Sequence, residues 1–253
     1  MKRNFYEVSK DISKSLFAEE QCEYNCTLHF HRAFEVSYIH SGASRYEVEG
    51  NVFVAECDDI FFSHCYYSHK TYDDLPNKKY VIAVPLNLST EIDAMFRKTT
   101  LPELCQDKEF NKTLLPYFEI LVNQSAEMPE IVVKGYLYLI FGLLRRHYGD
   151  VKIKKQSKNV SLISDILNYI DAHCQENISL SSIAKSLGYN KSYLSRTFNN
   201  SIGISFSDYL NGVRLDRFKK LQKEKIGCSI TELVFSAGFQ SLATFYRVYA
   251  SAK

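Results

Sequence analysis

The 253-residue sequence contains no tryptophan and no apolar run near the ~20 residues that a membrane-spanning helix requires. Its first residues, MKRNFYEVSKDISKSLF, include basic side chains but no apolar core, so they do not form the pattern of a secretory signal peptide. Both absences argue against a membrane or secreted protein. We therefore expect a cytoplasmic protein.

A CxxC pair is also missing, although the sequence has seven cysteines. Cys22 and Cys26 lie close together, but no second pair follows at the spacing of a zinc-binding motif. An odd, scattered set of cysteines does not form a disulfide framework. Reduced thiols are the simplest interpretation, and they agree with a cytoplasmic location.

Charge divides the chain into two unequal halves. Residues 151–253 hold 15 Lys and Arg against 7 Asp and Glu, whereas residues 1–150 hold 16 against 22. A basic C-terminal half suits a polyanionic partner, because binding to phosphates releases counterions. The length allows one large or two ordinary domains, and the composition, 45% hydrophobic and 24% charged, is that of a globular protein.

The first half has the pattern of short strands. From residue 27 to residue 69, apolar or alternating runs such as FEVSYIH and NVFVAE are separated by turn signals, and residues 78–87 form one more such run. Regular short strands predict a sandwich or small barrel. Helical spacing then predicts helices over 90–100, 110–125 and 129–148, followed by a polar, basic linker over 150–158.

One histidine motif lies among these strands. His29, His31 and Glu35 form HxHxxxE, and His69 follows later. Three imidazoles and a carboxylate suit Zn, Mn, Fe or Ni, but the same groups also serve as hydrogen-bonding residues of a pocket wall without metal. The motif resembles that of the cupin domains, and by this resemblance His29, His31, Glu35, Tyr38 and His69 would line an effector pocket. The second cupin motif survives mainly as His69, so we expect no bound metal or cofactor.

The second half contains two similar helical units. In the first, Ile183, Ala184 and Leu187 precede Gly188, and Leu194 and Phe198 follow at helical spacing. The second unit repeats the scheme with these residues: Ile230, Leu233, Val234, Gly238, Phe239, Phe245 and Tyr249. Helices over 159–175 and 205–224 precede and join the two units. Two helix-glycine-helix units predict a pair of helix-turn-helix motifs, with Ser179 and Asn190 as N-caps.

Helical geometry sets apart the residues that would face DNA. With Leu194, Phe198, Phe245 and Tyr249 turned inward, the outer faces carry Ser192, Ser195, Arg196, Asn199, Gln240, Ala243, Thr244 and Arg247. Each second helix presents one arginine, which can bind guanine in the major groove. We therefore expect double-stranded DNA as the partner.

These units resemble the AraC/XylS family of bacterial transcription regulators. The resemblance rests on IAKSLGYNKSYLSRTFNNSIGISFSDYLNGVRL and GFQSLATFYRVY. The matching positions are Leu194, Arg196, Phe198, Gly203, Phe206, Tyr209, Leu210, Arg214, Gly238, Phe239, Phe245 and Arg247. The resemblance implies a regulator with a cupin-like sensor domain and dimerisation helices N-terminal to the DNA-binding domain.

The second unit departs from the family pattern. Phe218 replaces a small residue of the linker helix, Leu233-Val234 replaces Ile-Ala, and Tyr249-Ala250 replaces Phe-Lys. The sequence also ends at Lys253, before the usual Gly-x-x-Pro-x-x-Tyr-Arg tail. We therefore expect an unequal pair, in which the first unit carries most of the specificity.

The predicted fold class is α+β, with an N-terminal cupin-like antiparallel β-barrel and helix pair, and a C-terminal all-α double helix-turn-helix domain. The expected parts are a sensor over 1–100, a dimerising helix pair over 101–149, the linker and a DNA-binding domain over 159–253. We expect a homodimeric, sequence-specific regulator that responds to a small molecule and has no catalytic residues. Two alternatives are a metal-dependent cupin enzyme with a DNA-binding appendage, and a DNA-binding protein whose β domain only dimerises.

Overall fold

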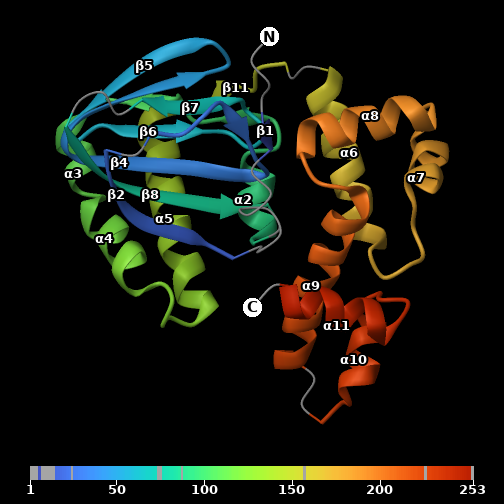
Figure 1. Cartoon of the computed structure of the whole chain (residues 1–253). Coiled ribbons are helices and arrows are strands. Elements are labelled where there is room, and N and C mark those ends of the chain that lie inside the picture. The colour runs from blue at the N-terminus through green and yellow to red at the C-terminus, as the bar shows by residue number, and fades with distance from the viewer. Residues whose placement is uncertain are drawn as a thin grey trace. The chain divides into compact units, whose positions relative to one another are not determined.

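The computed structural model describes residues 5–6, 15–23, 25–72, 76–86, 88–155, 158–224 and 227–251. The chain divides into two compact units, Met1–Lys155 and Gln156–Lys253 (Figure 1). Among the described residues, no helix is both long and apolar enough to cross a membrane. Each unit has its own secondary structure and core.

Strands dominate the first unit, as the sequence predicted. Their bounds are β1 Phe5–Tyr6, β2 Phe17–Cys22, β3 His29–Phe30, β4 Ala33–Val48, β5 Asn51–Glu56, β6 Ile60–Ser63, β7 His69–Tyr72, β8 Asn77–Pro85, β9 Thr99–Thr100, β10 Leu104–Cys105 and β11 Val151–Lys152. All pairings between them are antiparallel except that of β1 with β3.

Strand β4 organises the sheet. Its first part pairs with β6 on one side and β8 on the other, while its last part pairs with β5 and β7. The register with β8 shifts between Ile39 and Ser41, where a bulge bends the strand. One layer therefore contains β1, β3, β7 and β5, the other contains β2, β8, β6 and β10, and β4 belongs to both. The antiparallel β domain is confirmed; pairings among the described strands join the layers through β4 and do not link their outer strands into a closed barrel.

Aromatic and aliphatic side chains fill the space between the layers. Tyr46 stacks on Phe61 with ring centroids 3.7 Å apart. The rest of this buried cluster is Ile39, Val48, Ala55 and Tyr67. Near the end of β4, Tyr46 and Val48 alternate with the less buried Arg45 and Glu47, as expected for a strand with one buried face.

The helices of the first unit follow β8 in sequence. Their bounds are α2 Thr90–Met95, α3 Lys108–Lys112, α4 Leu115–Gln124 and α5 Glu130–Tyr148. The single helix expected over 110–125 is wrong, because Pro116 starts a new helix at α4. Proline lacks the amide hydrogen of a helix interior but fits the first turn. Phe141 of α5 packs on Phe96 and on Phe62 of β6, so one face of α5 lies against the sheet.

The described residues of the second unit form the helices α6 to α11 (Figure 1). Their bounds are α6 Lys158–His173, α7 Leu180–Leu187, α8 Lys191–Ile202, α9 Phe206–Glu224, α10 Ile230–Ser236 and α11 Leu242–Ser251. The pairs α7–α8 and α10–α11 are the two predicted helix-turn-helix units, and α9 is the predicted connecting helix. The double motif is therefore confirmed.

Capping residues explain where the first pair begins and turns. The Ser179 hydroxyl accepts a hydrogen bond from the Ser182 amide at 3.2 Å, and the Asn190 side chain accepts one from the Ser192 amide at 2.8 Å. Both satisfy amides that lack a partner in the first helical turn. Gly188 ends α7 in the left-handed conformation, which glycine adopts without strain. Both predicted N-caps are confirmed.

Candidate nucleic-acid interface and histidine cluster

The outer face of α8 carries the predicted DNA-binding side chains. Ser192, Arg196 and Asn199 are exposed and Ser195 is half-buried. Leu194 is fully buried on the opposite face. The helix is therefore fixed by its apolar face, while its polar face is open to a partner.

Arg196 is the cation among the four predicted DNA-binding residues of α8. Its Nε donates to the Ser192 carbonyl of the same helix at 3.3 Å. Within the described part of the chain, its guanidinium forms no ion pair with a carboxylate. Its terminal nitrogens can therefore form the two parallel hydrogen bonds that guanine recognition requires.

The outer face of α11 is organised differently. Ala243 and Arg247 are exposed, as is Gln240 in the turn before α11, whereas Thr244 is half-buried. Ser241 accepts a hydrogen bond from the Thr244 amide at 3.2 Å and donates to its hydroxyl at 3.0 Å. Thr244 is thus engaged at the start of its own helix. The sequence reasoning missed the capping role of Ser241, although a serine three residues before a threonine at a helix start is a recognisable signal.

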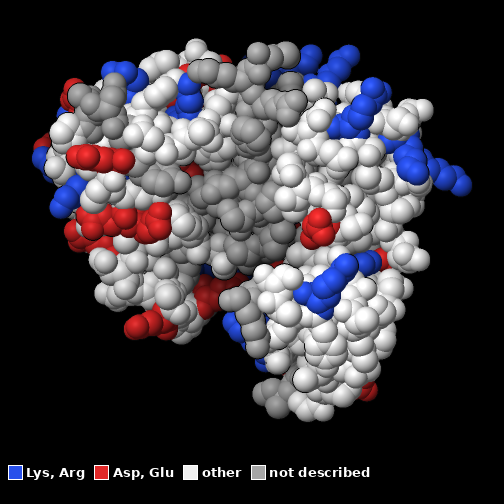
Figure 2. Space-filling view, in the orientation of Figure 1, with Lys and Arg blue, Asp and Glu red and all other residues white. Residues whose placement is uncertain are grey.

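Two carboxylates of this unit are used in helix caps. Glu232 accepts from the Ser229 amide at 2.9 Å and Asp208 accepts from the Ser205 hydroxyl at 2.7 Å. The hydrogen bond from the Ser229 amide lowers the pKa of Glu232. Figure 2 shows more Lys and Arg than Asp and Glu on the visible surface of the C-terminal helices. Cations therefore dominate the charge that an approaching polyanion meets.

Three histidines meet inside the β domain. His29 of β3, His31 and His69 of β7 are buried, and one ring nitrogen of each lies within 4.8 Å of the others. Direct register pairing between β3 and β7 places His29 opposite His69. Their ring centroids are 4.3 Å apart. The structure therefore brings together the three imidazoles that the sequence predicted as one site.

Backbone carbonyls orient these rings. Nδ1 of His29 lies 2.9 Å from the Thr27 carbonyl, and Nδ1 of His69 lies 2.8 Å from the Tyr67 carbonyl. A proton on Nδ1 donates to each carbonyl and leaves the lone pair of Nε2 for a metal ion. Burial and the neighbouring His29 hold the pKa of His69 well below its usual value. A neutral imidazole is the form that binds metals.

Glu35 lies at the edge of the cluster. Its Oε2 is 3.3 Å from Nε2 of His31 and 3.9 Å from Nε2 of His69. Cys26, which was interpreted as an ordinary thiol, also lies beside the site. Although burial opposes protonation of His29, the hydrogen bond with Cys26 and the charge of Glu35 raise its pKa overall. No local pattern in the sequence connects Cys26 to a histidine.

Tyr38 does not join this cluster, and its place in an effector pocket stays a prediction. Its hydroxyl donates to Asp58 at 2.8 Å, and its ring packs on Phe118 of α4 at 5.5 Å. The reason is strand geometry, since alternate side chains point to opposite faces and Tyr38 is three residues from Glu35. Tyr38 therefore links the sheet to the helix pair.

Comparisons with known proteins give one family and several relatives. A helix-turn-helix domain family matches residues 183–253. An uncharacterised HTH-type transcriptional regulator of Staphylococcus aureus is 28% identical over 129 residues, which cover 50% of this chain and 17% of that protein. The chain thus spans less than a fifth of the length of that relative.

Two further comparisons cover most of the chain. The HTH-type transcriptional regulator YbfI of Bacillus subtilis is 21% identical over 220 residues, which are 83% of this chain and 78% of that protein. The solved structure of ToxT from Vibrio cholerae is 15% identical, with a TM-score of 0.41, over 94% of this chain and 93% of that chain.

The family match spans most of the second unit, from within α7 through α11. It contains both glycine-marked turns, the connecting helix and both arginines of the outer faces. Together with the similarity to HTH-type regulators, this match shows that the second unit contains a helix-turn-helix domain, and its double motif resembles that of the AraC/XylS family.

Proposed function

We propose that this chain is a sequence-specific DNA-binding transcription regulator. The observation that carries the proposal is the pair α8 and α11, each with a buried inner face and an exposed outer face that presents one arginine. The HTH-type regulators among its relatives support the same activity. A regulator works where the chromosome is, so the cytoplasmic location expected from the sequence is part of this proposal.

Recognition would begin with α8 in the major groove. Arg196 would donate two hydrogen bonds to a guanine, and Ser192, Ser195 and Asn199 would reach neighbouring bases or phosphates. The N-terminus of the helix, with exposed Lys191, would lie near a phosphate. Direct contacts to base edges would supply specificity, and contacts to phosphates would supply most of the salt-dependent affinity.

The second recognition helix, α11, would bind the major groove one helical turn further along the duplex. Helix α9 has 19 residues and is therefore about 28 Å long. This length is comparable to the ~34 Å between successive major grooves on one face of DNA. Because Thr244 is engaged with Ser241, α11 would offer Ala243 and Arg247, with Gln240 in the turn before it. This smaller set supports the expectation that the first unit carries most of the specificity.

The β domain would supply the response to a signal, and the histidine cluster favours a divalent metal ion as one ligand. His29, His31 and His69 would hold the ion through their Nε2 atoms, with Glu35 beside it. A bound ion would supply a cross-link between β3 and the β7 strand that pairs with it. We propose regulation rather than catalysis, because the relatives that cover this chain are named as regulators.

A homodimer would form through the exposed face of α5. Val132, Gly135, Leu139, Gly142 and Arg146 are spaced alternately by three and four residues, which places them on one seam. Val132 is 40% exposed and Leu139 46% exposed, and an added Cβ at either glycine would meet no atom within 4 Å. The opposite face of α5 already packs on the sheet, so this seam is free for a second copy of the chain.

Selection of bound duplexes from a random pool tests the proposed activity. We expect the full chain to enrich a motif of two blocks whose centres lie about one helical turn apart. The first block should be the better defined one. Recovery of unenriched sequence at every salt concentration would contradict a sequence-specific function.

A further inference from the structure

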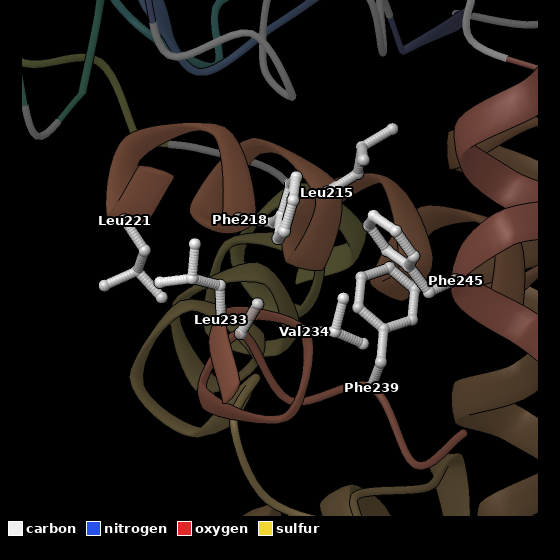
Figure 3. Packing of buried hydrophobic residues seen from close by; sticks show 8 residues of the cluster. Leu215, Phe218, Leu221, Leu233, Val234, Phe239 and Phe245 are labelled. Atoms are coloured by element: carbon white, nitrogen blue, oxygen red, sulfur yellow. The ribbon is translucent and has the colours of Figure 1, made fainter. Parts of the chain in front are cut away.

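Helix α9 changes partners halfway along its length. Its first turns pack on the first helix-turn-helix unit, where Phe198 of α8 contacts Phe206 and Tyr209 with centroids 5.9 Å away in each case. Its last turns enter the core of the second helix-turn-helix motif, where the ring centroids of Phe218 and Phe245 lie 4.6 Å apart (Figure 3). The two helix-turn-helix motifs therefore have separate cores, and both cores include side chains of α9.

Arg214 lies at the point where α9 passes from one core to the other. Its side chain is buried, with 6% exposed. Nε donates to the Cys174 carbonyl and Nη2 to the Glu176 carbonyl, both at 2.8 Å. These carbonyls follow the C-terminus of α6, where unpaired carbonyls and the negative end of the helix dipole favour a cation. Arg214 thus ties the connecting helix to the helix that precedes the first unit.

Gly238 places the turn of the second helix-turn-helix motif against the Cys174 carbonyl. It lies in the turn between α10 and α11 with a φ of 102°. A Cβ added there would lie 2.3 Å from the Cys174 carbonyl oxygen and 3.1 Å from Nε of Arg214. The next residue, Phe239, is buried in the core of the second helix-turn-helix motif. The turn therefore cannot withdraw from Cys174 without moving that core.

We propose that Arg214 and Gly238 are positioning residues that set the spacing and rotational phase of α8 relative to α11. Cys174, Arg214 and Gly238 meet at one point and join α6, α9 and the second turn. Neither residue lies on an outer face, so neither contacts a base. The inference rests on the proposed DNA-binding function and states how strictly that function depends on half-site spacing.

The contact of Cys174, Arg214 and Gly238 is here called the joint. A rigid joint and a loose joint predict different dependence of affinity on the spacing of the two DNA blocks. Two readers held in fixed phase bind a bipartite site only when its blocks are correctly spaced, because five added base pairs turn the second block about half a turn away. Readers on a loose joint bind the correctly spaced site less tightly and tolerate altered spacing better, since rigidity lowers the entropy cost of joint binding. Their preferences for bases within each block stay the same.

The test uses the full chain and the duplex that it selects from a random pool. Zero to five base pairs are inserted between the two blocks, and affinity is measured for wild type, Arg214→Gln and Gly238→Ala. Lys220→Gln is the matched control, because it removes one exposed cation of α9 outside the joint. We expect wild type and the control to lose about tenfold or more in affinity at the half-turn insertion. Both joint variants should bind the original duplex more weakly and lose little further affinity when the spacing changes.

A duplex with the first block alone separates a loosened joint from an unfolded protein. Arg214→Gln should bind it as wild type does, and Arg214→Lys, which keeps the charge, serves if the glutamine variant does not fold. Spacing profiles of the joint variants that match wild type would overturn the inference, as would a wild-type profile that is flat. Failure of wild type to select any DNA would instead overturn the proposed function.

Discussion

At the scale of single residues, Arg196 has the surroundings of a recognition side chain. It is exposed on the outer face of α8, while Leu194 and Phe198 anchor the inner face. Removing its guanidinium therefore leaves the core unchanged. Its loss should be felt in binding and not in folding.

Arg196→Ala should weaken binding to the selected duplex by about 1–3 kcal/mol and relax the preference at one base pair. Lys191→Gln is the comparison: it should weaken binding to all sequences alike and reduce the salt dependence. Fluorescence anisotropy with the selected duplex and its single-base variants measures both effects. An unchanged affinity of Arg196→Ala would remove α8 from the interface.

His69 permits a separate test of the β domain. Excess Zn²⁺ or Ni²⁺ should raise the melting temperature of wild type, because a ligand at 100 times its Kd adds about 2.7 kcal/mol to stability. His69→Ala should abolish the shift and the bound metal measured after dialysis. The control is His173→Ala, since His173 belongs to α6 and is half-buried with Glu176 as its partner. Equal metal content in all three proteins would show that the cluster binds none.

Residue chemistry explains which assignments could be made from sequence. The HxHxxxE spacing and a later histidine predicted the cluster of His29, His31 and His69, because alternate residues of a strand share a face. The same rule places Tyr38 on the other face of the strand, away from the three histidines. The contacts of Arg214 could not be predicted, since its partners lie 38 and 40 residues away in the chain.

At the scale of elements, caps and glycines fix where the helices start and turn. Asn190 starts α8 by accepting hydrogen bonds from two amides of its first turn, at 2.8 and 3.3 Å. The start of α8 in turn sets which residues form its outer face. These local signals are short-range, so they were readable in the sequence.

Asn190→Ala should lower the free energy of unfolding by about 1 kcal/mol, because both amides lose their acceptor. Asn200→Ala, at an exposed position of the same helix, should change it by less than about 0.5 kcal/mol. Urea unfolding followed by circular dichroism gives both values. Equal stability of the two variants would mean that the cap contributes nothing.

Element boundaries show the limit of periodicity. The helical spacing over residues 110–125 was real, but Pro116 divides it into α3 and α4. The predicted short strand FEVSYIH is only the first part of β4, because Gly42 and the neighbouring serines have the composition of a turn although the strand continues through them. Pairing on both sides keeps β4 continuous, and such long-range pairing is invisible to local patterns.

At the scale of the whole molecule, charge and pattern anticipated two parts. The acidic, strand-rich half and the basic, helical half correspond to the two compact units, whose boundary in the sequence lies between Lys155 and Gln156. The joining of two layers through one bent strand was not predictable, because it depends on a bulge opposite β8. Oligomeric state belongs to this scale as well.

Leu139→Glu should convert the proposed dimer into a monomer, since it places a charge at the centre of the α5 seam. Val52→Glu is the control, because Val52 is an exposed apolar residue of β5 outside that seam. Light scattering after gel filtration gives the mass of each protein. Wild-type mass for Leu139→Glu would place the interface elsewhere, and a monomeric wild type would remove the dimer from the proposal.

The most direct test of the central claim is a hydroxyl-radical footprint of the full chain on its selected duplex. Two readers joined by α9 predict two protected patches on one face of the DNA, with centres about 10 base pairs apart. Arg196→Ala should weaken protection of the better-defined block and leave the folded protein intact. Uniform protection, or a footprint that Arg196→Ala does not change, would contradict the claim that α8 and α11 read the sequence.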